Sequence, residues 1–61
     1  MTTKVYYIEN TNKLDKALIT LEQKIPCFIN RELIEMNYSK IEINARTEDL
    51  ITVETILAPL V

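Results

Sequence analysis

The 61-residue chain contains no glycine, no histidine and no tryptophan, and it has a single cysteine, Cys27. Without histidine it lacks the usual proton shuttle and the commonest metal ligand. Without glycine it lacks the loops that cradle phosphate groups. One cysteine can form neither an intrachain disulfide nor a four-ligand zinc site. These absences predict a protein that is not an enzyme and that holds neither a cofactor nor a metal.

Strong charge of one sign and long apolar runs are also missing. Seven basic residues against nine acidic ones give a net charge of −2, without the basic stripe of a typical nucleic-acid binder. No apolar stretch approaches the roughly 20 residues that cross a bilayer, and no secretory signal is visible. We therefore expect a soluble, cytoplasmic protein.

The short length limits the chain to one small domain, residues 1–61. A domain of this size buries only about 60% of the surface that its unfolded chain exposes. Small domains usually add disulfides, a metal or a partner subunit. Because the first two are missing here, the sequence predicts a homo-oligomer.

The first half of the chain shows a strand pattern followed by a helix pattern. Residues 4–9 are β-branched and aromatic, which predicts a strand. Apolar residues then recur at helical spacing, and this predicts a helix over residues 12–24 with a cap among residues 10–12: Leu14, Ala17, Leu18, Leu21 and Ile25. Pro26 ends this helix.

The second half is less uniform. Residues 27–36 favour a strand, with a short helix after Asn30 as the alternative, and Asn37 is the residue expected to adopt a positive φ in the following turn. Residues 40–46 alternate between apolar and polar, which predicts a half-buried strand. Residues 48–58 have helical spacing but many β-branched residues, so a strand stays the alternative to a helix there.

The resulting order is βαββα, an α+β domain with both helices on one face of a three-stranded sheet. This order resembles that of a ferredoxin-like domain without its last strand. A mostly α-helical chain with a helix-turn-helix-like unit is the alternative. In the βαββα arrangement the first strand lies at an open edge, where a two-fold dimer could form.

Few side chains suggest chemistry. Cys27 has apolar neighbours and no basic partner, so we interpret it as a core residue. Glu32, Glu35 and Glu42 could approach one another, but we interpret them as a solvated face. Aromatic residues on the strands suggest either stacking on RNA bases or a protein interface. We predict an interface from these candidates: Val5, Tyr6, Tyr7, Ile8 and Tyr38.

These patterns predict a non-catalytic protein-interaction module, a homo-oligomeric regulator or inhibitor that binds a larger protein. The wealth of Ile, Asn and Lys follows A/T-rich codons, which suggests a phage or mobile-element origin. A small nucleic-acid-binding transcriptional regulator is the alternative. A third hypothesis is an enzyme or ligand site that forms only between chains.

Overall fold

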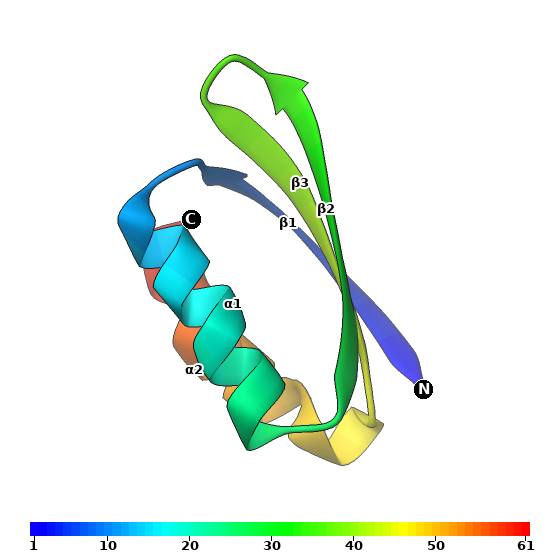
Figure 1. Ribbon diagram of the computed structural model, residues 1–61. Coiled ribbons are helices and arrows are strands. Elements are labelled where there is room, and N and C mark those ends of the chain that lie inside the picture. Colours follow the sequence, from blue (N-terminus) through cyan, green and yellow to red (C-terminus); the bar gives the residue numbers. More distant parts are fainter.

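The computed structural model describes residues 1–61 and shows an α+β domain with the predicted order of elements (Figure 1). Along the chain these are β1 (Thr2–Glu9), α1 (Asn12–Lys24), β2 (Cys27–Glu35), β3 (Tyr38–Ala45), the 3₁₀ turn η1 (Thr47–Asp49), α2 (Leu50–Leu57) and the 3₁₀ turn η2 (Ala58–Leu60). The strands lie in the order β1-β3-β2, and β3 is antiparallel to both neighbours. The predicted fold class is therefore confirmed.

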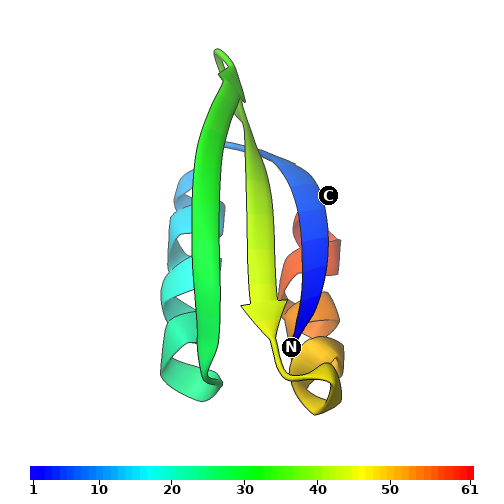
Figure 2. The same ribbon diagram turned by 90° about the vertical axis from the view of Figure 1, so that its right-hand side faces the viewer.

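The two helices cover one face of the sheet and leave the other face open (Figure 1). Seen from the open face, α1 lies behind β2 and α2 lies behind β1 (Figure 2). The helix-turn-helix alternative is wrong, because residues 27–35 pair with β3 as a strand and only α2 follows. β1 pairs with β3 alone, so it lies at an edge of the sheet as predicted.

The core lies between the sheet and the helices. Strand residues alternate between core and open face, so Tyr6 is buried while Tyr7 beside it is 56% exposed. The helical stripe of α1 and two α2 residues complete the layer. The buried apolar residues are Tyr6, Ile8, Leu14, Leu18, Leu21, Ile25, Ile41, Ile43, Ala45, Val53 and Leu57.

Both helices form for identifiable reasons. The hydroxyl of Thr11, rather than a side chain of Asn12, caps α1 by accepting a bond from the Leu14 amide at 3.3 Å. Ile25 is extended before Pro26, which ends α1 as predicted. Residues 50–57 are helical despite their β-branched side chains, because Val53 and Leu57, one turn apart, are both buried against the core.

The β2–β3 hairpin differs from its predicted form at the turn. No residue has a positive φ, so the prediction for Asn37 is wrong. A two-residue hairpin turn of the favoured type needs positive φ, and without it the flanking strands splay. β2 has an irregularity between Leu33 and Glu35, close to this turn. The hairpin extends past the end of the helical layer, at the top of Figures 1 and 2.

Candidate protein-interaction surfaces

The five predicted interface residues divide between the core and the surface. The side chains of Tyr6 and Ile8 are buried against the helices, where no partner reaches them. Val5, Tyr7 and Tyr38 are exposed, and their register positions place them on the open face of the sheet. The candidate surface therefore begins from these three side chains.

Charged side chains occupy the middle of the open face. Lys40 Nζ lies 3.3 Å from Glu42 Oε1, and Glu32 lies opposite Lys40 in the register. The hydrogen bond to Glu42 raises the pKa of Lys40 above its usual range. With Glu9 and Glu35, four carboxylates share this face with one ammonium group, so the open face is acidic. This field disfavours a phosphate backbone.

The remaining residues considered for chemistry are scattered. Cys27 is half-buried against the core, and burial followed by the nearby carboxylates Glu22 and Asp49 raises the pKa of its thiol. A protonated thiol is a weak nucleophile. Glu32 and Glu35 are exposed, and no group of three potential metal ligands forms anywhere in the chain.

Four exposed apolar side chains lie at the end of the β2–β3 hairpin, on both faces of the sheet. We call Leu33, Ile34, Met36 and Tyr38 the hairpin tip. Leu33 is 67% exposed and Met36 is 90% exposed, although both are large apolar side chains. Of these residues only Tyr38 was identified from the sequence, because Leu33, Ile34 and Met36 resemble core residues of a strand. An exposed apolar cluster of this kind is typical of an interaction site.

A polar network holds the base of the hairpin tip. The Asn10 side-chain oxygen accepts hydrogen bonds from Ser39 Oγ at 2.6 Å and from Arg31 Nη2 at 2.9 Å. The Asn10 amide donates to the Asn37 carbonyl at 2.6 Å. Arg31 also donates to Asp15 Oδ1 at 2.7 Å. Asn10 thus joins the end of β1 to both strands of the hairpin.

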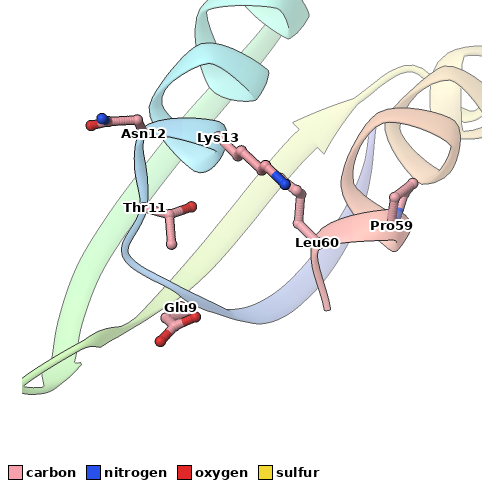
Figure 3. A pocket seen from close by; sticks show the side chains of 6 residues that line it. All are labelled: Glu9, Thr11, Asn12, Lys13, Pro59 and Leu60. Atoms are coloured by element: carbon pink, nitrogen blue, oxygen red, sulfur yellow. The ribbon is translucent and has the colours of Figure 1, made fainter.

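Two shallow hollows lie beside the helices. The first, of about 470 Å³, is formed by the end of β1, the start of α1 and the η2 turn (Figure 3). Its charged groups, Glu9 and Lys13, have opposite sign and leave no net charge for a ligand. The second hollow, of about 490 Å³, runs between β1 and α2. Its lining residues are Thr2, Lys4, Leu50, Ile51, Glu54 and Thr55.

A small set of contacts fixes α2 beneath β1 at the second hollow. The Tyr6 hydroxyl donates a hydrogen bond to the Glu54 carboxylate, and Lys4 Nζ lies 3.6 Å from the same carboxylate. The bond from Tyr6 and the charge of Lys4 lower the pKa of Glu54. Burial, followed by this bond and the nearby negative charge, raises the pKa of Tyr6. These contacts therefore hold α2, which forms one wall of the hollow, against β1.

Comparison with known proteins gives no relative of this chain. No family model, no curated protein and no solved structure matches it. Neither of its two helices has the length and apolar character needed to cross a membrane.

Proposed function

We propose that this protein is a non-catalytic interaction module that regulates or inhibits a larger protein by docking its hairpin tip into an apolar pocket. The exposure of Leu33 and Met36 carries the proposal. Burying a large apolar side chain contributes about 1.5–3 kcal/mol, so two such residues supply substantial binding energy. The tip projects beyond the helices, which suits insertion into a concave partner (Figure 1).

Hydrogen bonds hold the base of the tip in the free chain. The bonds from Asn10 to Ser39, Arg31 and Asn37 tie its base to β1 and, through Arg31, to α1. A segment that is already held in one conformation loses less entropy on binding. This anchoring supports a recognition role for the tip rather than that of a loose connecting loop.

The charges near the tip indicate the rim of the partner pocket. Glu32 and Glu35 flank the apolar residues, and both are exposed. An anionic lipid surface would repel these carboxylates, whereas basic residues around a protein pocket would attract them. The expected partner therefore has an apolar pocket with a basic rim. The acidic open face supports the alternative of nucleic-acid binding less well.

Self-association at the β1 edge, which the sequence predicts, would also bring two α2 helices together. A flat sheet continued through two β1 strands places the strands, and the α2 helices beneath them, only about 5 Å apart. Packed helix axes need about 8–10 Å. A homo-oligomer could instead use the hairpin tip. Light scattering measures the mass of the purified 7.1 kDa chain in solution, and this mass distinguishes self-association through the tip from docking on a different protein.

The test compares captured proteins from lysate of the source organism across three forms of the bait. The first is the unchanged protein, the second carries Leu33→Ser and Met36→Ser, and the third carries Ile19→Ser and Phe28→Ser. The third is a matched control, because Ile19 and Phe28 are also exposed apolar residues but lie away from the tip. All three forms should unfold at similar urea concentrations, because surface changes are usually within about 0.5 kcal/mol.

A candidate captured by the first and third forms is then purified and titrated against all three. We expect the tip variant to bind it at least tenfold more weakly and the control variant to bind within twofold. A partner that binds all three forms equally would overturn docking through the tip. A mass of two or more chains that falls to one chain in the tip variant would assign the tip to self-association instead.

A further inference from the structure

The backbone groups of β1 divide into two sets. In an antiparallel pair, the amide and carbonyl of one residue point to the same side, and the side alternates along the strand. The Asn10 amide bonds to the Asn37 carbonyl, so the backbone groups of Asn10 point toward the hairpin. The same register continues through Ile8, which lies opposite Ser39, so every second residue of β1 before Asn10 has this orientation. Lys4, Tyr6 and Ile8 therefore bond to β3. The groups that face the open edge belong to Thr3, Val5, Tyr7 and Glu9.

Exposed apolar side chains flank this edge on both faces of the sheet. Val5 and Tyr7 lie on the open face, next to the edge. On the helix side, Ile51 is 79% exposed and lines the hollow between β1 and α2 together with Leu50. A strand added to β1 would bury apolar surface above and below it while satisfying the free backbone groups.

The edge is also regular. β1 pairs with β3 residue for residue from Thr2 to Glu9, and no irregularity interrupts it. Natural edge strands are commonly blocked by bulges, by prolines or by charged side chains, lysine above all. β1 has no proline or bulge, and the one charge between Thr3 and Ile8, on Lys4, is paired with Glu54.

We propose that β1 and the adjoining hollow bind an extended segment of another protein as a fourth, antiparallel strand. Such a guest carries no helix beneath it, so it avoids the clash between α2 helices that a second copy would cause. This site is separate from the hairpin tip, and the inference does not depend on docking through the tip.

The register defines the chemistry of the guest. Its residues opposite Val5 and Tyr7 place their side chains on the open face, and its residue opposite Tyr6 places its own on the helix side, next to the hollow that Lys4 and Ile51 line. All three positions favour β-branched apolar residues. A basic residue suits the position opposite Glu9, and an acidic one the position opposite Lys4. In the antiparallel direction, the peptide Lys-Thr-Val-Ile-Val-Glu-Thr meets these requirements.

The test titrates this blocked peptide into the full-length, isotope-labelled protein and measures amide exchange by NMR. We expect exchange to slow at least tenfold at the amides of Thr3, Val5, Tyr7 and Glu9. The amides of Lys4, Tyr6 and Ile8, already bonded to β3, should change little. A peptide with N-methyl groups on its two valines, which pair with Val5 and Tyr7, should not bind.

Variants of two exposed isoleucines give a matched control. Ile51→Glu, which also repels the glutamate of the peptide, should weaken peptide binding at least tenfold, whereas Ile19→Glu on α1 should leave it within twofold. The tip variant Leu33→Ser/Met36→Ser should bind the peptide normally, so failure of this site is distinguishable from failure of the tip.

A tethered form removes the dependence on peptide affinity. Val61 follows Pro59 and Leu60, which line the same hollow as Glu9, so the chain ends near the point where the guest would enter. We therefore fuse the peptide after Val61 through a short flexible linker, which raises its effective concentration to the millimolar range.

The tethered protein should show the same four protected amides and should unfold at a higher urea concentration than a fusion with a scrambled peptide. Absence of protection in both the free and the tethered forms would overturn the proposal. So would protection of these amides in the protein alone, accompanied by a dimeric mass, because a second copy would then occupy the edge.

Discussion

The two edge strands of this small sheet, β1 and β2, present different chemical groups to a binding partner. On β2, an irregularity between Leu33 and Glu35 interrupts the strand, and the strand leads into exposed apolar side chains. On β1, the pairing is regular and the outer backbone groups are free. Bulges discourage the addition of another strand, so the irregularity protects the edge at β2, and β1 has no such bulge. One edge therefore suits recognition by side chains, and the other suits recognition by the backbone.

The largest effect should come from Ile43, because β3 supports both edges. Ile43 is fully buried, and Ile43→Ala should cost about 2–5 kcal/mol of unfolding free energy. Urea denaturation measures this loss, and amide exchange should rise in β1 and β2 together. Ile51→Ala, at an exposed site, is the control and should change stability by less than about 0.5 kcal/mol. Faster exchange in only one edge strand would show that the edges are independent.

Asn10→Ala should lower the unfolding free energy less than Ile43→Ala does, and its effect should be confined to the β2–β3 hairpin. The change removes the acceptor for Ser39 and Arg31 and leaves the buried Ser39 hydroxyl without a partner, at a cost of about 1–3 kcal/mol. Amide exchange should quicken more over residues 31–39 than over residues 3–7. Asn12→Ala is the control, since that side chain makes no hydrogen bond in the structure. Equal loosening of both regions would contradict the assignment of Asn10 to the hairpin.

The β1 side should respond to acid through Glu54. Its pKa is lowered in the folded state, chiefly by the bond from Tyr6, so its charged form stabilises the fold above the ordinary pKa of about 4.3. That stability is lost as the pH falls through the lowered value. The unchanged protein should therefore be more stable than Glu54→Gln at pH 6, and the difference should vanish near pH 3. Because Glu54 is solvent-exposed, we expect a smaller effect than that of Asn10→Ala.

Urea denaturation at the two pH values measures this difference. Glu35→Gln is the matched control on the β2 side, since Glu35 makes no ion pair or hydrogen bond through its side chain. It should show no comparable pH-dependent difference. Equal unfolding free energies of Glu54→Gln and the unchanged protein at pH 6 would show that the Glu54 carboxylate does not stabilise the packing of α2 against β1.

Local patterns in the sequence were enough to predict the elements of this fold. The stripe that includes Leu14, Leu18 and Leu21 predicted α1, and Pro26 predicted its end. The helical spacing of Val53 and Leu57 predicted α2 correctly, although its β-branched residues left a strand open. In each case the decisive residues are close together in the sequence and face one core.

The candidate sites depend on contacts that no local pattern reports. Asn10 meets Arg31 and Ser39 from positions 21 and 29 residues away, so its role depends on the finished topology. Leu33 and Met36 resemble core residues, but the hairpin extends past the helices that would have covered them. The sequence did predict an open edge at β1. It could not predict that α2 lies directly beneath that edge.

The smallest effect on stability is expected from substitutions at two separate aromatic residues, one on each edge strand. These substitutions also test most directly which edge binds the peptide. Tyr7 on β1 and Phe28 on β2 are both exposed on the open face, and lysine at either site should change unfolding free energy by less than about 0.5 kcal/mol. Tyr7→Lys should nevertheless weaken the seven-residue peptide, because it removes an apolar contact beside the guest. Phe28→Lys should not, since two strands separate it from that edge. Equal weakening by both variants would mean that the peptide binds across the open face, and β1 would then have no special role.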